Sequence, residues 1–397
     1  MKQATDEIYG MILSGGGAYG AYEVGVMKAL FNGESPATFY TPLNAGVFSG
    51  TSVGAFNAAV MTMLPELDLS STAGQLEKIW INDISDSRER CGNGVYRFRG
   101  NPFSYLDLEC ARTGPTEPFA ALAGDTMFFA QDFFRRSTNF FLTPGSLPRR
   151  ILQMVDLSAL ISIEPFRDLV GDSLHLEGIY QSDRLLRIAA TNWQTGELKI
   201  FKNEDMTGER GRHAIMASAA IPGVFPPVEV AGDMYVDGGV VMNTPLKCAI
   251  QAGATTLHVV YLDPDIENVP IKKLYNTLDT IDRLFTIAMA TKTNEDIDTA
   301  LWVNEGLQVI ERASRGDALS NADMLAFIRV ASEIQKRIAA GSPYKKLTIH
   351  RYHPHDELGG ILGMLDFEQQ TILRLIKRGF KDAAQHDCAA SHCILPC

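Results

Sequence analysis

Hydrophobic residues near the start of the chain form a short continuous run and then recur at helical spacing. The run spans residues 8–13, and a cluster of glycines follows it. Apolar residues then return at intervals of one to four positions: Val24, Met27, Leu30 and Phe31. A short apolar run is typical of a buried strand, whereas the second spacing places side chains on one face of an α-helix. The pattern predicts a strand, a tight loop and a helix.

The same order of elements repeats directly afterwards. Val47 and Phe48 lie in a short apolar run before Gly50. One face of the next helix carries the apolar residues Val53, Phe56, Val60 and Leu64. Two consecutive strand-loop-helix units indicate parallel strands, which helices bury on the faces of a sheet. We therefore expect an α/β protein, built as a three-layer α/β/α sandwich with a mainly parallel sheet.

Later segments extend this architecture over residues 5–385, which we interpret as a single domain. Strand-like runs return at residues 185–193 and 256–264, and residues 270–385 have a helical pattern. Two apolar stripes in this last region should pack on the sheet. They comprise Phe327, Ala331, Ile334 and Ile338, and then Ile372, Leu375, Ile376 and Phe380.

Residues 86–160 break the regular pattern. Gly and Pro interrupt the first half, and six phenylalanines lie among arginines between positions 125 and 152. We predict a variable helical cap that is inserted into the domain. Its aromatic side chains either form a small core or contact acyl chains at a lipid interface, where the arginines would bind phosphate.

The composition limits the classes of partner. The chain has 397 residues, 46% of them hydrophobic, and a net charge of −11 without a basic patch, so we expect no nucleic-acid partner. No apolar run approaches the roughly 18 residues that a membrane-spanning helix needs, and the N-terminus lacks the apolar core of a signal peptide. We expect a cytoplasmic protein that is peripheral at membranes; export without a cleavable signal is left open.

Six cysteines in a chain of this length do not indicate a disulfide framework. Three of them, Cys388, Cys393 and Cys397, lie with two histidines in the tail of residues 386–397. Their spacing matches no standard zinc motif. We predict a disordered tail without a metal, and a metal-binding knuckle is the alternative.

The candidate chemistry begins at the glycine loop after the first strand, with Gly15, Gly16, Gly17 and Gly20. Successive glycine N–H groups can form a concave nest that binds a phosphate or stabilises an oxyanion. The spacing also satisfies the GxGxxG pattern of dinucleotide-binding proteins. That pattern requires an acidic residue about 20 positions on, and Glu34 follows the last glycine too closely. A Walker loop is excluded because no Gly-Lys-Ser/Thr follows.

The second candidate is the sequence Gly50-Thr51-Ser52-Val53-Gly54. It matches the nucleophile elbow, in which a strained strand-to-helix turn exposes a serine. The positive end of the helix dipole would favour negative charge that develops at the Ser52 oxygen. A serine that only caps a helix gives a similar pattern.

A third candidate is Asp237, which ends a strand-like run and precedes Gly238 and Gly239. This arrangement exposes a carboxylate at the end of a strand, although an Asp-Gly pair also forms ordinary turns. The presence of a serine elbow and a glycine loop on other strands favours a catalytic role.

Together these motifs resemble the patatin-like phospholipases, in particular the bacterial and neuropathy-target-esterase-like branch of that family. The glycine loop, the elbow and the aspartate motif occur in the family's order. The resemblance extends to ASAAIPGVFPPV at residues 217–228, NTP at 243–245 and LDFEQQTILRLIKRGFKDA near the end. It covers most of residues 8–265, without the aromatic insertion.

The resemblance implies a lipid acyl hydrolase that cleaves carboxylic esters of phospholipids, lysophospholipids or acylglycerols. Ser52 would be the nucleophile, Asp237 its partner in a Ser-Asp dyad, and the Gly15–Gly17 backbone the oxyanion hole, with no metal or organic cofactor. Lipid substrate and membrane surface are then the partners. One departure is Tyr19, where the family commonly has Arg or Lys, which puts a preference for anionic headgroups in doubt.

Three other interpretations compete. A Ser-Asp-His triad in the chain order of α/β-hydrolases would use His350, His353 or His355. However, an early elbow leaves little sheet before it, and we expect these histidines in a polar surface turn. A GxGxxG oxidoreductase gives no role to Ser52 or Asp237, and a non-catalytic lipid-binding module leaves Ser52 without a function.

Overall fold

The computed structural model describes residues 7–87, 92–98, 125–131, 134, 161–262, 301, 304–313, 315, 319–338, 347–354, 358 and 363–395. Within these residues, one eight-stranded sheet has the order β10-β9-β1-β2-β5-β8-β7, and β6 pairs with β5 beside this path. Its strands are β1 (Tyr9–Leu13), β2 (Ala45–Thr51), β5 (Leu185–Asn192), β6 (Leu198–Lys202), β7 (Val228–Val230), β8 (Asp233–Asp237), β9 (Thr256–Val260) and β10 (Thr348–Tyr352). A separate pair joins β3 (Arg97–Phe98) and β4 (Ile161–Ser162).

The sheet is mainly parallel, as the sequence predicts. Strands β10, β9, β1, β2 and β5 are parallel neighbours. Strands β6 and β8 run antiparallel to β5, and β7 runs antiparallel to β8. The four strands expected from apolar runs are all present as β1, β2, β5 and β9.

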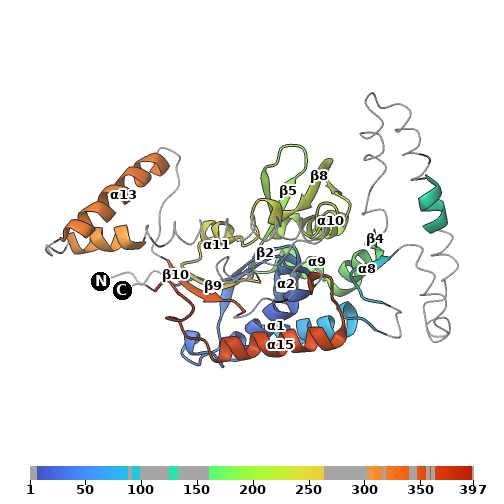
Figure 1. Cartoon of the computed structure of the whole chain (residues 1–397), viewed down its shortest axis with the longest axis horizontal. Coiled ribbons are helices and arrows are strands. Elements are labelled where there is room, and N and C mark those ends of the chain that lie inside the picture. The colour runs from blue at the N-terminus through green and yellow to red at the C-terminus, as the bar shows by residue number, and fades with distance from the viewer. Residues whose placement is uncertain are drawn as a thin grey trace, which may run out of the picture.

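Helices cover both faces of the sheet and complete the three layers. The α-helices with described bounds are α1 (Gly20–Phe31), α2 (Val53–Thr62), α3 (Leu69–Ile79), α8 (Glu164–Ser173), α9 (Leu176–Gln181), α10 (Gly208–Ser218), α11 (Leu246–Gln251), α13 (Asn321–Ile338) and α15 (Gln369–Ala384). Helix α13 lies to the side of the sheet rather than on one of its faces (Figure 1). Figure 1 shows α1 and α15 side by side below the sheet, with α11 on the opposite side.

Alternation along the central strand explains the two apolar layers. Met11 and Leu13 of β1 belong to the larger hydrophobic cluster, whereas Ile12 belongs to a smaller cluster with Leu246 of α11. Successive side chains of a strand point to opposite faces, so a strand buried on both sides reads as a continuous apolar run. The continuous apolar run at residues 8–13 is therefore explained by burial of β1 on both faces.

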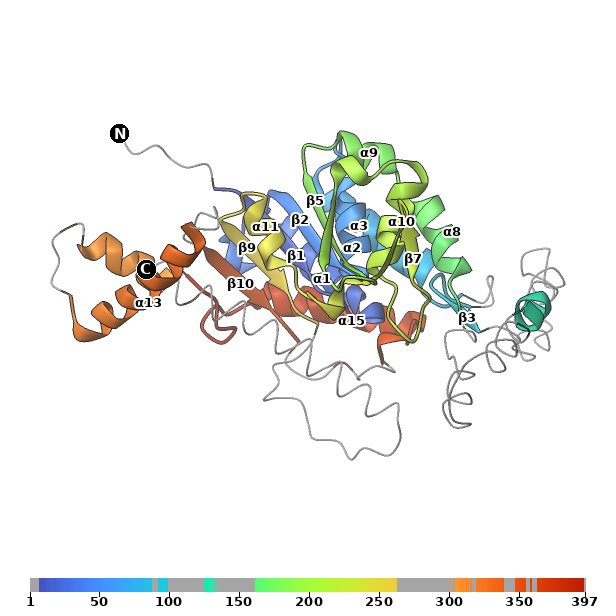
Figure 2. The same ribbon diagram turned by 90° about the horizontal axis from the view of Figure 1, so that it is seen from above.

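The C-terminal region follows the sequence prediction only in part. The stripe on α15 is confirmed, because Ile372, Leu375 and Ile376 are buried. The stripe on α13 is wrong where its side chains are described, because Phe327 and Ala331 are exposed. Residues 348–352, which lie in the region predicted as helical, form the edge strand β10, visible beside β9 in Figure 2.

Several expectations fall on residues that the structure does not describe. The cap at residues 86–160 and the segment at 263–300 lie largely or wholly outside the described ranges. The same holds for Cys397 and His355. Among the described residues, no helix combines the length and the apolar composition that crossing a membrane requires.

The tail after α15 packs against the sheet. Ile394 and Ile349 of β10 exchange two backbone hydrogen bonds of 2.9 and 2.8 Å, and the Ile394 side chain is buried. The prediction of a disordered tail is therefore wrong for residues 386–395. The single apolar residue Ile394 does not predict packing against the sheet, because the segment around it is polar and rich in Cys and His.

Candidate active site

The register of the sheet brings the three predicted motifs together at the ends of neighbouring central strands. Leu13, which precedes the glycine loop, pairs with Gly50 of β2. On the other side of β2, Thr51 pairs with Ala189 of β5, and Ala190 pairs with Asp237. Ser52 and Asp237 therefore flank the same part of β5, although they are far apart in the sequence.

Ser52 has the strained backbone that a nucleophile elbow requires. Its φ of 56° and ψ of −125° lie outside the regions that L-residues favour. The tight turn explains both flanking glycines. A Cβ at Gly50 would lie 2.1 Å from the carbonyl oxygen of Gly54, and one at Gly54 would lie 2.4 Å from the carbonyl oxygen of Leu13.

A hydrogen bond from another element supports this turn. The Ser52 N–H donates to the hydroxyl oxygen of Ser218 at 3.0 Å, and that hydroxyl donates to the carbonyl oxygen of Ala189 at 2.6 Å. The last residue of α10 thus connects the elbow to β5. The Ser52 N–H is consequently occupied and is not a free donor toward a substrate.

Asp237 is a buried carboxyl group whose pKa is raised to about 7. Burial is the main cause, because the charged form loses its hydration. Hydrogen bonding by the Gly239 N–H, at 2.7 Å from Oδ1, and by the Ser52 hydroxyl lowers the pKa and offsets part of this rise. Gly238 lets the strand end approach β5, because a Cβ there would lie 2.3 Å from the Ala189 carbonyl oxygen.

Ser52 and Asp237 do not form a complete hydrogen bond in this structure. Within ordinary distance and angle limits, Oδ2 of Asp237 has no partner in the described part of the chain. The Ser52 hydroxyl nevertheless lowers the pKa of the Asp237 carboxyl group, although less than burial raises it. Catalytic hydrogen bonds are often long without substrate and tighten when it binds.

The glycine loop supplies two amide groups beside Ser52. Asn243 occupies the Gly15 N–H, with acceptor distances of 3.2 Å to its main-chain oxygen and 3.1 Å to Oδ1. By contrast, no hydrogen bond joins the N–H of Gly16 or Gly17 to the described residues. Gly17, with a φ of +56°, lines the same pocket as Ser52.

Gly20 serves packing rather than ligand binding. It begins α1, and a Cβ at this position would lie 2.4 Å from Cγ2 of Val53. Its lack of a side chain lets α1 approach the helix that follows the elbow. The dinucleotide interpretation has no support in this geometry, because Glu34 is exposed after α1 and the end of β2 leads into Ser52.

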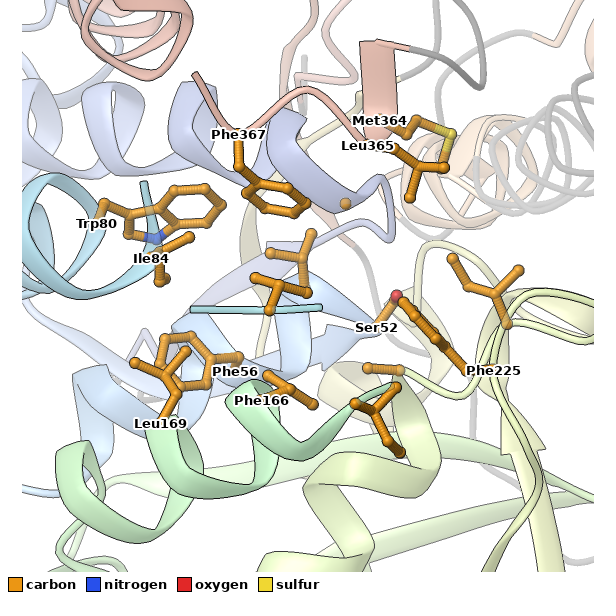
Figure 3. Close-up of a pocket in the computed structure, with 16 residues that line it drawn as sticks. Ser52, Phe56, Trp80, Ile84, Phe166, Leu169, Phe225, Met364, Leu365 and Phe367 are labelled. Atoms are coloured by element: carbon orange, nitrogen blue, oxygen red, sulfur yellow. The ribbon is translucent and has the colours of Figure 1, made fainter. Parts of the chain in front are cut away.

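An apolar pocket opens at Ser52. It holds about 590 Å³ of empty space, including its open mouth, and no titratable side chain lines it in the described part of the chain. Figure 3 shows Ser52 and Phe225 toward one end, Trp80 and Leu169 toward the other, and Phe367 between them. The volume suits a small-molecule ligand or an acyl chain.

Sequence reasoning missed a buried polar network behind this pocket. Glu23 accepts a hydrogen bond from Asn57 at 2.8 Å, and Asn57 accepts one from the Trp80 indole at 2.9 Å. Burial raises the pKa of Glu23 well above its usual value, which favours the neutral acid. A lone acidic residue within the apolar sequence of α1 was the available signal.

Of the described candidate histidines, His350 lies too far from the elbow to complete a triad with Ser52 and Asp237. His350 lies on β10, at the edge of the sheet, and strands β9 and β1 separate it from β2. It is buried, so the expectation of a polar surface turn is wrong for this residue. His353 follows directly after β10.

The fold and the site define an α/β protein in which a strained serine elbow and a glycine loop line one pocket, with a buried aspartate across β5 from the elbow. A sequence profile described as Patatin-like phospholipase matches residues 11–250. The match covers more than half of the chain, which therefore belongs to this family.

Two individual proteins are similar to parts of the chain. The uncharacterized protein R571 of Acanthamoeba polyphaga mimivirus is 23% identical over 247 residues, which are 62% of this chain and 62% of the viral protein. The chain thus matches about three fifths of that relative. The crystal structure of VipD from Legionella pneumophila aligns with 97% of this chain and 67% of its own, at 15% identity and a TM-score of 0.40.

Proposed function

We propose that this protein is a lipid acyl hydrolase that cleaves carboxylic esters through a Ser52–Asp237 dyad. The observation that carries the proposal is the position of Ser52, on a strained turn between a buried carboxyl group and an apolar pocket. Membership in the patatin-like phospholipase family supports the same class of activity.

In the first half of the reaction, Ser52 Oγ attacks the ester carbonyl carbon and ionised Asp237 accepts the hydroxyl proton. Its raised pKa makes Asp237 a stronger base than an exposed aspartate. The N–H groups of Gly16 and Gly17 stabilise the oxyanion of the tetrahedral intermediate. Collapse of this intermediate breaks the ester C–O bond, the alcohol leaves with the proton from Asp237, and an acyl-Ser52 remains.

Water completes the cycle by the same steps in reverse order. Asp237 removes a proton from the water that attacks the acyl-Ser52 carbonyl, and the same two amides hold the second oxyanion. Release of the Ser52 oxygen, with the proton returned by Asp237, yields a free fatty acid. The apolar pocket holds the acyl chain throughout, because apart from Ser52 and Gly17 its lining consists mostly of apolar side chains.

We infer that phospholipids, lysophospholipids and acylglycerols are the substrate class, presented at a membrane surface that the protein meets peripherally. Tyr19, at the position where relatives commonly carry a cation, is buried. It offers no positive charge for a headgroup. We therefore propose that the acyl chain, rather than an anionic headgroup, dominates recognition.

The test compares wild type, Ser52→Ala and Asp237→Asn on these lipids and on short-chain esters, with fluorophosphonate labelling of the serine. Both variants should lose at least about 100-fold in kcat, and Ser52→Ala should lose the label. Ser49→Ala is the matched control, because it removes a buried hydroxyl on β2, shortly before Ser52, that donates to the Pro245 carbonyl oxygen at 3.0 Å. Full activity of either dyad variant would falsify the mechanism.

A further inference from the structure

A cluster of histidine and cysteine side chains lies at the edge of the sheet. His350 comes from edge strand β10, whereas His386, Cys388 and Cys393 come from the segment after α15. One nitrogen or sulfur atom of each residue lies within 4.8 Å of the corresponding atom of every other. His350 and His386 are buried, and the two cysteines are partly buried. The ester hydrolysis proposed above uses none of them.

We propose that these four residues bind a Zn²⁺ ion that fastens the C-terminal segment to the sheet. The separations fit a tetrahedral centre. His350 Nδ1 lies 3.5 Å from Cys388 Sγ, and His386 Nε2 lies 3.3 Å from Cys393 Sγ. Bonds of about 2.3 Å to sulfur and about 2.0 Å to nitrogen place neighbouring S and N ligands of a tetrahedral zinc roughly 3.5 Å apart.

The donor set identifies the metal and the kind of site. Two thiolates and two imidazoles form a Cys₂His₂ set, which favours zinc among the common metal ions. Four protein ligands leave no open position, which is typical of a structural site. Each cysteine releases one proton to solvent when the ion binds, so the two thiolates balance the charge of Zn²⁺.

Neighbouring groups hold the ligands in this arrangement. The backbone N–H of Arg351 donates to Cys393 Sγ at 3.3 Å, a contact that orients a sulfur ligand. The His350 ring stacks on His258, with centroids 4.9 Å apart, and the His386 ring lies 4.6 Å from that of Tyr352. Both imidazoles are therefore fixed by side chains that are not ligands.

The proposed ion has a clear structural purpose. An edge strand exposes unpaired backbone groups, and β10 is covered here by a tail that contributes one isolated bridge, between Ile394 and Ile349. A zinc ion shared by β10 and the tail would hold this cover in place. The site lies three strands from β2, or about 14 Å at the usual strand spacing, so it takes no part in ester cleavage.

The first test measures metal directly in the full chain, purified under reducing conditions without a histidine tag. Elemental analysis should find about one zinc per chain. After exchange with Co²⁺, the wild type should show the visible bands of a tetrahedral centre and sulfur-to-cobalt charge transfer. A chain that binds neither ion, or that forms a Cys388–Cys393 disulfide under these conditions, overturns the proposal.

The second test compares variants. Cys388→Ser and Cys393→Ser should each weaken Zn²⁺ affinity by about 100-fold or more, and removal of zinc from the wild type should lower its Tm. His392→Asn is the matched control, because His392 is exposed in the same tail and its φ of 49° suits asparagine. Zinc binding that survives in the double cysteine variant contradicts the site.

Activity separates this proposal from the catalytic one. At a temperature where the zinc-free protein stays folded, lipid ester hydrolysis should continue at the wild-type rate. The Co²⁺ spectrum of the wild type needs no variant, so a cysteine variant that fails to fold does not decide the outcome. Loss of Ser52 should abolish hydrolysis and leave zinc binding intact.

Discussion

The N–H of Ser52 donates to the hydroxyl oxygen of Ser218, and through it α10 supports the elbow from the side opposite the glycine loop. Ser218→Ala removes this acceptor and leaves a buried N–H without a partner. We expect kcat to fall by about 10- to 100-fold, with little change in KM, because the nucleophile is displaced. The cost to stability should be roughly 1–3 kcal/mol.

Fluorophosphonate labelling rates provide the check on this positioning role. Labelling of Ser52 should slow in Ser218→Ala by a factor similar to the loss in kcat. Ser49→Ala, which also removes a buried hydroxyl, should label at the wild-type rate. An unchanged labelling rate in Ser218→Ala contradicts the role assigned to the residue.

The pKa of about 7 for Asp237 predicts the pH dependence of the reaction. Only the ionised carboxylate accepts the proton, so kcat/KM should rise as a single ionisation through about pH 7 and then level off. Initial rates with a short-chain ester, corrected for spontaneous hydrolysis, measure this profile. A rate that is already maximal near pH 5, well below the folded-state pKa, is incompatible with Asp237 as the base.

The same pKa predicts that Asp237 opposes folding at higher pH. Its value rises from 3.8 to about 7 on burial. An acid with a raised folded-state pKa stabilises the fold at low pH and loses that contribution as the pH rises through the folded value. Relative to Asp237→Asn, the wild type should therefore lose stability between about pH 4 and 7, by roughly 4 kcal/mol at most.

Thermal unfolding of the two proteins measures this effect. The excess Tm of Asp237→Asn over the wild type should be larger at about pH 8 than at about pH 4. Other titrating groups are common to both chains and cancel in the difference. Equal differences at both pH values would mean that the carboxyl group titrates alike in the folded and unfolded chains.

Leu169 lies at the end of the pocket away from Ser52, and its size should set the acyl length (Figure 3). Leu169→Trp should lower the rate with long-chain esters by about tenfold or more while short-chain esters react normally. Leu169→Met conserves the volume and serves as the control. Equal losses for all chain lengths would indicate a folding defect rather than a shortened pocket.

Calcium should not affect the reaction, because amide groups rather than a cation are proposed to hold the oxyanion. In calcium-free buffer that contains Zn²⁺, addition of Ca²⁺ should leave the initial rate unchanged. The zinc keeps the proposed C-terminal site filled during the comparison. A rate that depends on added Ca²⁺ contradicts the cofactor-free mechanism.

The apolar pattern predicted the central strands because their burial is a local property of the sequence. Residues 8–13 (IYGMIL) contain no charged residue, and β1 within them is buried on both faces. Strand β10, with the sequence TIHRY, lacks this pattern. His350 contacts Cys388 there, and Tyr352 contacts His386. Both partners are distant in the sequence.

In the candidate site, too, local motifs were predictable from the sequence and contacts between distant residues were not. Short motifs marked Ser52, Asp237 and the glycine loop, because each requires particular residues at fixed spacing. Ser218 and Asn243 were not assigned roles, since a polar side chain gives no sign of which distant backbone group it will meet. The predicted oxyanion hole of Gly15–Gly17 needs one correction. The N–H of Gly15 donates to Asn243 and is therefore not available to an oxyanion.

The pairing of β5 with both β2 and β8 also bears on how the protein acquires its chemistry during folding. Ser52 and Asp237 meet only after contacts between remote parts of the chain have closed, and such contacts form slowly. A half-folded chain is therefore chemically inert, however much local helix it contains. Recovery of esterase turnover after denaturation should consequently lag behind recovery of helical circular dichroism.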